Sequence, residues 1–393
     1  MINSKHLVRT IRRKNYLALS RRLLMVNSLL LLLLAHAGAQ NDLPADKHAT
    51  KETMNLYRNL HKSLQKGIMF GHQDDYAYGV NWEYKPGRSD IKDVTGDYPA
   101  VLGCEIGRIE LDWEKDLDGV PFDSTRQYIQ QAYNRGSVIT MSWHLNNPFT
   151  GKTAWDPAPG TVKAILPGGV KNAVYNSWLD KVAAFMQSLK GAKGEAIPVI
   201  FRPFHELNGS WFWWGRNNCT PEELKNLYQY TERYLRDVKG VHNLLYAYNT
   251  DRFATKEEYL ERYPGDEWVD IIGFDIYQKD AVKTNEAFIA DLDKSLTTLE
   301  AIAKEHNKVP ALTEFGYNTV PDSTWWTNVL WQGLKNHKVA YALGWRNAGD
   351  KGNGETEYWV PYPGQQSAGD FVQFYQLPRT LFAKDVAALK MYQ

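Results

Sequence analysis

Two glutamates follow apolar segments and have the side chains needed for acid–base or nucleophilic chemistry. Glu206 ends the segment 197–206, and Glu314 follows the apolar residues 309–312 closely. Hydrolysis of a glycosidic bond requires such a pair: one carboxyl group protonates the departing oxygen, and the other attacks the anomeric carbon or activates water. In a retaining enzyme the two groups lie about 5–5.5 Å apart. The alternative for Glu206 is a purely structural ion pair with Arg202 at a strand end.

Aromatic residues cluster directly after Glu206. The sequence Trp-Phe-Trp-Trp occupies positions 211–214 in a chain that contains 14 Trp and 23 Tyr. An exposed indole is unfavourable in water unless it stacks on the apolar face of a ligand such as a sugar, or closes a core. Side chains alternate in direction along an extended segment, so Trp213 and Trp214 cannot both face a cleft, and at least one of them is expected to be structural.

Eight apolar segments alternate with helical patterns along the chain. Strands are predicted over residues 68–72, 99–106, 137–144, 197–206, 243–249, 269–277, 309–316 and 339–345. Helices are predicted over residues 54–64, 124–134, 178–189, 220–238, 285–306 and 325–335. Near-continuous apolar strands are typical of a parallel sheet that is covered on both faces. Eight strand–helix units predict an α/β fold, a single (β/α)8 TIM barrel. An open doubly wound sheet is the alternative, but no G-x-G-x-x-G sequence follows the first strand.

Two long segments follow the third and eighth predicted strands. Residues 146–176 and 347–370 are rich in Gly, Pro, Asn and aromatic residues. In a barrel these segments are extended βα loops on the C-terminal face, where active sites lie. We therefore expect them to form a substrate cleft beside the two glutamates.

The first 40 residues have the composition of a secretory signal. They contain seven basic and no acidic residues, an apolar run over 23–35 and the small-residue sequence Ala-His-Ala at 35–37. The apolar run is shorter than a typical membrane span of about 20 residues. We predict a signal peptide over residues 1–39, with an uncleaved anchor as the alternative. The catalytic domain then spans 40–393, secreted or periplasmic, with no membrane contact after cleavage.

Charge and cysteine content narrow the possible partners. Without the seven N-terminal basic residues, 39 basic residues face 45 acidic ones. A mildly acidic protein is poorly suited to nucleic acid, and we expect a monomer without such a partner. Only Cys104 and Cys219 are present. Export permits a disulfide between them, whereas the apolar strand around Cys104 favours a buried thiol.

Several motifs together resemble glycoside hydrolase family 26, whose best-known members are β-mannanases. The similarity covers nearly the whole chain after the signal. The matching segments are GHQ at 71–73, WH at 143–144, RPFHE at 202–206 with GSW at 209–211, GFDIY at 273–277, and TEFG at 313–316. The string around Glu206 is the most specific of these, and the others support it because they follow in order on the expected strands.

The resemblance implies roles for individual residues in a retaining double displacement. Glu206 would be the acid/base and Glu314 the nucleophile, on strands four and seven. The hydroxyl of Tyr277 would hold the nucleophile in place. The resemblance implies further substrate-binding residues: His144, His205, Trp211 and Trp345. For each of them a structural role at the barrel rim or in the core is the alternative.

Other acidic and basic residues near strand ends receive less definite roles. Arg202 is expected to orient carboxylates rather than to touch the bond that is cleaved. No role is assigned to Glu105, Asp75 or Asp275, and family members often have Asp near the Glu105 position.

The resemblance implies hydrolysis of mannan, glucomannan or galactomannan by an endo-β-1,4-mannanase without a metal or other cofactor. Release of mannobiose from chain ends, or action on β-glucan or β-1,3-xylan, is the alternative on the same scaffold. A carbohydrate-binding barrel without activity and a metal hydrolase using His72, His144 and His205 are alternatives of other classes. The presence of both glutamates argues against the first, and the lack of local ligand spacing argues against the second.

Overall fold

The computed structural model describes residues 43–279, 284–350 and 355–393. The chain divides into two units, Met1–Leu43 and Pro44–Gln393. The predicted signal peptide, residues 1–39, lies outside the described residues. All features below belong to the second unit.

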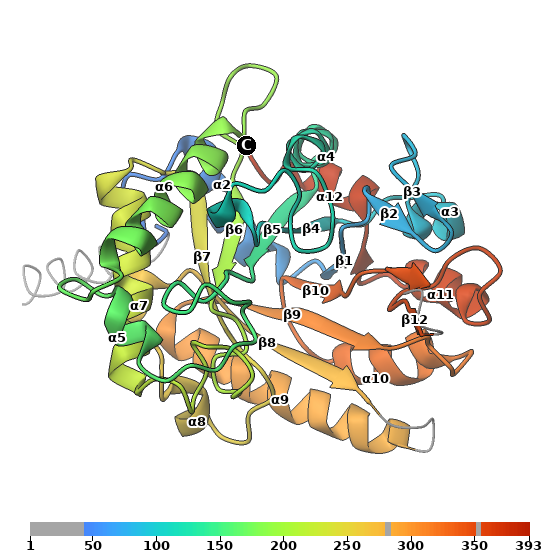
Figure 1. The fold of residues 1–393 in the computed structure, drawn as a ribbon. Coiled ribbons are helices and arrows are strands. Elements are labelled where there is room, and N and C mark those ends of the chain that lie inside the picture. The colour runs from blue at the N-terminus through green and yellow to red at the C-terminus, as the bar shows by residue number, and fades with distance from the viewer. Residues whose placement is uncertain (1–42, 280–283, 351–354) are drawn as a thin grey trace, which may run out of the picture. The chain divides into compact units, whose positions relative to one another are not determined.

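A closed barrel of parallel strands forms the centre of the described structure (Figure 1). The strand order is β10-β9-β8-β7-β6-β5-β4-β1, and β1 pairs with β10 to complete the ring. The strands are β1 (Ile68–Gln73), β4 (Val101–Glu105), β5 (Val138–Trp143), β6 (Val199–Pro203), β7 (Leu244–Thr250), β8 (Ile271–Gln278), β9 (Val309–Tyr317) and β10 (Tyr341–Gly344). The prediction of a (β/α)8 barrel is therefore confirmed, and each predicted strand overlaps one of these.

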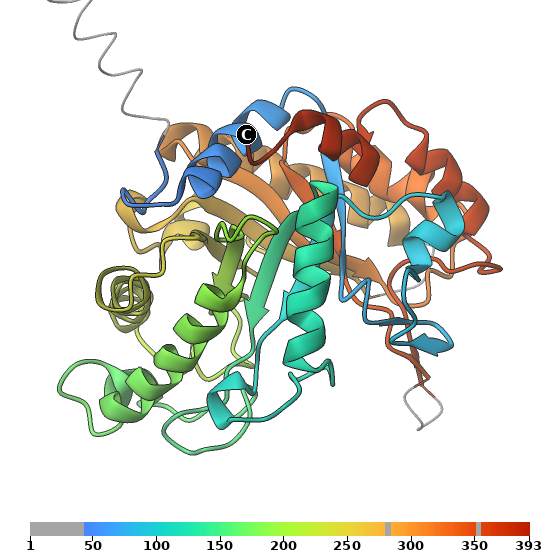
Figure 2. The same ribbon diagram turned by 90° about the horizontal axis from the view of Figure 1, so that it is seen from above.

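Helices lie outside this ring of strands (Figure 1, Figure 2). The longer ones are α2 (Lys51–Ser63), α4 (Phe122–Arg135), α6 (Asn172–Ser188), α7 (Pro221–Arg233), which continues into the π-helix η2 (Tyr234–Val238), and α9 (Asn285–His306). The predicted helix near 325–335 is the π-helix η5 (Trp326–Leu330) followed by α10 (Trp331–Leu334). A capping box at Thr220 begins α7, as the Thr-Pro-Glu-Glu sequence indicates.

Short elements in the loops were not predicted, because a few residues carry too little periodicity to identify them. The helices among them are α3 (Asp90–Thr95), η1 (Ile109–Leu111), α5 (Thr161–Ile165), α8 (Lys256–Leu260), η3 (Asp266–Trp268), α11 (Ala368–Tyr375) and α12 (Ala383–Leu389). The strands among them are β2 (Tyr78–Gly79), β3 (Trp82–Glu83), β11 (Gly349–Asp350), β12 (Thr356–Glu357) and β13 (Thr380–Leu381). The long loops expected after strands three and eight thus contain α5, the β11–β12 pair and the start of α11.

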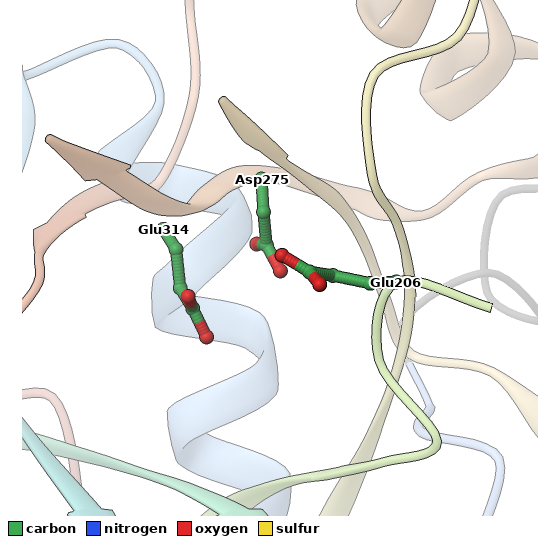
Figure 3. A group of neighbouring side chains, drawn as sticks. All are labelled: Glu206, Asp275 and Glu314. Carbon is green, nitrogen blue, oxygen red and sulfur yellow. The ribbon is translucent and has the colours of Figure 1, made fainter. Parts of the chain in front are cut away.

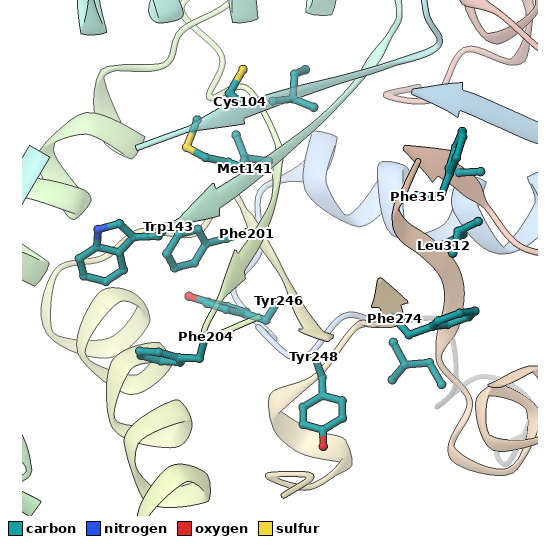
Figure 4. Close-up of a cluster of buried hydrophobic side chains, with 14 of the residues drawn as sticks. Cys104, Met141, Trp143, Phe201, Phe204, Tyr246, Tyr248, Phe274, Leu312 and Phe315 are labelled. Atoms are coloured by element: carbon teal, nitrogen blue, oxygen red, sulfur yellow. The ribbon is translucent and has the colours of Figure 1, made fainter. Parts of the chain in front are cut away.

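Alternate residues of each strand belong to two different core layers. On β6, Phe201 packs in the larger layer between strands and helices, whereas Ile200 packs in the smaller layer with residues of α2. Figure 4 shows part of the larger layer, including Phe201, Phe274 and Leu312. This period of two places Arg202 on the same side of β6 as Ile200, inside the barrel.

Both cysteines are buried free thiols, so Cys104 and Cys219 do not form the disulfide that export would permit. Within the described ranges, no helix combines the length and apolar character needed to cross a membrane.

Candidate active site

Three carboxyl groups converge at the C-terminal end of the barrel (Figure 3). They belong to Glu206, Asp275 and Glu314, and one oxygen of each lies within 4.8 Å of the others. Sequence reasoning identified the two glutamates and left Asp275 without a role. The structure therefore brings the predicted pair together and adds a third, buried carboxyl group beneath it.

A β-bulge directs Glu314 into the barrel. In the pairing of β8 with β9, Phe274 lies opposite Leu312, but Asp275 lies opposite Glu314, so Thr313 is an extra residue. Leu312 and Phe315 both pack in the outer core layer, three residues apart, which regular alternation does not allow. The bulge reverses the direction of Glu314, a common function of bulges beside active sites.

Glu206 lies beyond its strand rather than at its end. β6 stops at Pro203, and the backbone then takes positive φ angles at Phe204 (+54°) and Glu206 (+51°). Such angles are unfavourable for residues other than glycine and are concentrated at functional sites. The strand predicted to reach residue 206 was too long, because this strained turn ends the ladder early.

The indole of Trp211 folds back onto Glu206 and donates a hydrogen bond from Nε1 to its Oε2 at 2.6 Å. A Cβ at Gly209 would lie 2.4 Å from the Trp211 ring, so only glycine permits this close approach. Trp211 is the predicted sugar platform, and 39% of it is exposed.

Arg202 forms hydrogen bonds with two of the three carboxyl groups, those of Glu314 and Asp275. Its guanidinium donates hydrogen bonds to Glu314 Oε1 and to Asp275 Oδ2, the latter at 3.3 Å. A further bond to Asn249 Oδ1, at 2.7 Å, fixes its orientation. All three acidic and basic side chains are buried. Arg202 therefore orients the carboxylates of Asp275 and Glu314, as the sequence suggested. The buried positive charge of its guanidinium offsets their negative charge.

The surroundings of Glu206 and Glu314 act differently on the two carboxyl groups. Burial raises the pKa of Glu206 to about 8, and the charges of Glu314 and Asp251 add to the effect. Glu314 receives hydrogen bonds from Arg202 and, at 2.6 Å, from the hydroxyl of Tyr277, and both donors stabilise its charged form. The raised pKa favours the protonated form of Glu206 at neutral pH, which is the form that a general acid needs.

The surroundings of Asp275 raise its pKa. Burial and the Glu314 charge raise its pKa well above the ordinary value, although Arg202 opposes this. Thr313 donates to its other oxygen at 2.8 Å.

His144 and His205 pack against each other with ring centroids 4.3 Å apart. His144 Nδ1 lies 2.7 Å from Glu105 Oε2. Burial alone would lower the pKa of His144, but the Glu105 carboxylate raises it above the ordinary value. Burial, with the charges of His144 and Arg202, lowers the pKa of His205 well below that value. The pKa values of the two histidines therefore shift in opposite directions, and the upward shift of His144 is due to Glu105, to which the sequence analysis assigned no role.

Aromatic side chains border a hollow of about 440 Å³ beside the carboxylates. Its lining includes His144, Trp155, Trp345, Arg346 and Asp118. Trp155 stacks on His144, with centroids 5.4 Å apart. Trp345, which the sequence predicted as a sugar platform, is thus part of this lining. Trp155 was not predicted, because it does not lie at the end of a predicted strand.

The other two indoles of the aromatic run are structural. Trp213 and Trp214 are both fully buried and donate to the carbonyls of Leu145 and His205. The expectation that at least one would be structural therefore holds for both.

The ring nitrogens of the three histidines of the metal alternative do not lie close enough to one another to hold an ion. Nδ1 of His72 is bonded to Asp75, and Nδ1 of His144 to Glu105. Across the described ranges, the donor atoms that lie close enough to hold an ion belong to the three carboxyl groups of Glu206, Asp275 and Glu314. Arg202 already donates hydrogen bonds to two of them, Asp275 and Glu314.

Comparison with known proteins gives a consistent result. The family profile of glycosyl hydrolase family 26 matches residues 45–338. A mannan endo-1,4-β-mannosidase of Bifidobacterium adolescentis is 35% identical over 86% of this chain, although the chain spans only 35% of that protein's length. A mannan endo-1,4-β-mannosidase of Bacillus subtilis is 29% identical and covers 77% of this chain, which spans 81% of it.

The structure of a family 26 β-mannanase from Bacteroides ovatus matches with a TM-score of 0.83 and 45% identity, over 88% of this chain and 98% of that one. The barrel, the converging carboxylates and these similarities lead to one assignment: the chain belongs to glycosyl hydrolase family 26 and is a glycoside hydrolase.

Proposed function

We propose that this chain is a retaining endo-β-1,4-mannanase that hydrolyses mannan, glucomannan or galactomannan. The observation that carries the proposal is the Glu206–Glu314 pair. One oxygen of each carboxyl group lies within 4.8 Å of the other, burial raises the pKa of Glu206, and Glu314 accepts hydrogen bonds from Arg202 and Tyr277. Inverting enzymes keep their carboxyl groups about 6.5–9.5 Å apart to admit a water molecule. The names of the family relatives support mannan as the substrate.

In the proposed first step, Glu314 attacks the anomeric carbon and Glu206 gives its proton to the departing oxygen. The glycosidic bond breaks, and an ester forms between Glu314 and the sugar. Esterification removes the Glu314 charge, so the pKa of Glu206 falls. In the second step Glu206 takes a proton from water, the water oxygen attacks the anomeric carbon, and Glu314 is released.

Tyr277 and Arg202 act as positioning residues in this scheme. Each holds a different oxygen of Glu314, which restricts rotation of the carboxylate and aims it at the sugar. As charge leaves Glu314 during the attack, these hydrogen bonds weaken, and during the second step they stabilise the departing carboxylate.

Product analysis on linear mannan and mannopentaose tests the proposal. Wild type is expected to give a spread of early products, and the anomeric proton signals of fresh products are expected to show the β configuration. Glu206→Ala and Glu314→Ala should each lower the rate by orders of magnitude. Early α products would refute retention, and cleavage of mixed-linkage glucan or xylan without cleavage of mannan would refute the substrate.

Release of mannobiose from chain ends is the second candidate, and one contact favours it. Arg346, after β10, forms ion pairs with Asp118 at 2.8 Å and with Glu357 at 3.3 Å. This contact joins two loops across the hollow beside Trp345, which would restrict the length of sugar chain on that side. Mannobiose as the sole product from the earliest time point would select this candidate.

We also propose that the protein is exported and works as a monomer outside the cytoplasm. The basic, apolar and small-residue segments of its first 40 residues support export. N-terminal sequencing of protein recovered from periplasm and medium tests this, because a start near residue 40 is expected. Recovery only from the cytoplasm with an intact N-terminus would refute it.

A further inference from the structure

Three tryptophans are exposed among the described residues, and one of them lies apart from the catalytic carboxylates. The exposed fractions are 54% for Trp113, 46% for Trp155 and 39% for Trp211. Trp211 bonds Glu206, and Trp155 stacks on His144, so both border the candidate active site. Trp113, the most exposed, has no contact with that site.

Trp113 borders a groove of about 700 Å³, the outer groove, between α4 and α6. Its lining includes Trp113 and Glu114 from the loop after β4, Phe122 and Arg126 from α4, and Lys181 and Phe185 from α6. Figure 2 shows both helices on the outside of the barrel. The outer groove is larger than the hollow beside the carboxylates and lies on the wall of the barrel rather than inside its opening.

One contact covers a face of the Trp113 indole. The guanidinium of Arg108 stacks on the ring, 4.6 Å from its centroid. Arg108 and Asp112 both have positive φ angles, +79° and +60°, on either side of η1. These strained positions direct the loop outward. Arg108 covers one part of the ring, and 54% of Trp113 stays exposed, which leaves an aromatic surface on which a ligand can stack.

The loop that carries Trp113 is rigidly attached to the barrel. The buried carboxylate of Glu110 accepts hydrogen bonds from Trp143 Nε1 at 3.1 Å and from the backbone NH of Asn146 at 2.8 Å. Lys181 on α6 donates to the Glu110 carbonyl and pairs with Asp112, both at 2.7 Å. The same loop lines the hollow of the candidate active site at Asp118. One rigid loop therefore borders both the active site and the outer groove.

The charges around the outer groove favour an uncharged ligand. Asp112 pairs with Lys181, and Asp123 pairs with Arg126 at 2.7 Å. These pairs leave Glu114 as the one further charge among the lining residues, so the field is weak, and they offer donors and acceptors beside the aromatic face. Hydroxyl groups with an apolar CH face, as in a neutral polysaccharide, match this combination.

We propose that the outer groove is a second carbohydrate-binding site, at which Trp113 holds β-mannan polymer outside the active site. The proposal rests on the proposed function, because the occupant is taken to be the polymer that the enzyme cleaves. Such a site raises the local concentration of substrate without taking part in bond cleavage.

Binding to insoluble β-mannan tests the proposal without any need for catalysis. The background is Glu314→Gln, which leaves the polymer intact. Addition of Trp113→Ala is expected to weaken binding about five- to tenfold, the loss of one aromatic stack. Trp113→Phe should keep most of the binding. Val238→Ala, a change at another exposed apolar residue on the π-helix after α7, should leave binding unchanged. Equal binding by the Trp113→Ala protein would overturn the proposal.

A kinetic test in the active enzyme separates the two proposals. Trp113→Ala should cleave mannopentaose at the wild-type rate but release sugar from insoluble mannan several-fold more slowly. Wild type that fails to cleave mannopentaose would refute the proposed function, while the binding assay would still decide the role of Trp113. Sedimentation that shows a dimer of wild type lost in Trp113→Ala would identify the outer groove as a protein interface and overturn the proposal.

Discussion

The raised pKa of Glu206 should depend strongly on the charge of Glu314, and Glu314→Gln removes that charge with little change in shape. The two carboxylates approach within 4.8 Å. At that separation and an effective dielectric constant of about 20, their repulsion is about 3.5 kcal/mol, or about 2.5 pKa units; at the dielectric constant of water it is about 0.6 units. Because burial also raises the pKa of Glu206, part of the shift remains. We expect the pKa to fall from about 8 by roughly 0.6–2.5.

Carbon-13 NMR titration of protein with labelled glutamate carboxyl groups measures this shift. Glu206→Gln identifies the resonance of Glu206 by its disappearance. Asp251→Asn is the matched control, because the Asp251 charge also raises the pKa of Glu206, but less than that of Glu314. It leaves both catalytic groups intact, so the alkaline limb of kcat/KM should move slightly to lower pH. A Glu206 pKa that stays near 8 in Glu314→Gln would refute the charge coupling and, with it, the proposed change from acid to base.

Three further outcomes are expected. The folded-state pKa of Glu206 exceeds its unfolded value, so its contribution to stability is fully present at pH 4 and is lost as pH rises through about 8. Glu206→Gln should therefore melt at a higher temperature than wild type at pH 9 but not at pH 4. The same difference in melting temperature at both pH values, measured by calorimetry, would contradict this. Tyr277→Phe removes a donor to charged Glu314 and should lower kcat about 10- to 100-fold with little change in KM; unchanged kcat in steady-state assays would exclude the positioning role. Cys104 and Cys219 should react with a thiol reagent only after unfolding, giving two thiols without reductant; a count of zero would mean a disulfide.

The strand-and-helix pattern was predictable because the barrel buries its strands on both faces. Such burial requires near-continuous apolar segments, and these are visible in the sequence without knowledge of their neighbours. The helix Asn285–His306 was predicted with its observed bounds for a similar reason, since 22 residues of regular periodicity outweigh local noise. The two glutamates of the candidate site were singled out because each follows an apolar segment, aromatic residues lie beside them, and the motifs around them resemble a known family.

The remainder of the site depends on contacts between residues far apart in the chain. Arg202 and Glu314 are separated by 112 positions, and Glu105 and His144 by 39. No local pattern shows which acid faces which base. Trp155 stacks on His144 from the interior of a long loop, where sequence periodicity carries no information.

The sequence by itself determined the order of strands and helices, the barrel that follows from eight such units, and the identity of the two glutamates. Only the tertiary structure decided which way those glutamates point. Strict alternation would place Glu314 on the outer face with Leu312, and a strand extended to residue 206 would misplace its partner. The bulge at Thr313, which arises from the pairing of β8 with β9, turns Glu314 inward. The turn after Pro203, with positive φ angles at Phe204 and Glu206, ends the strand and places Glu206. The raised pKa of Glu206 follows from the same packing, because burial and the nearby charge of Glu314 exist only once the barrel has closed.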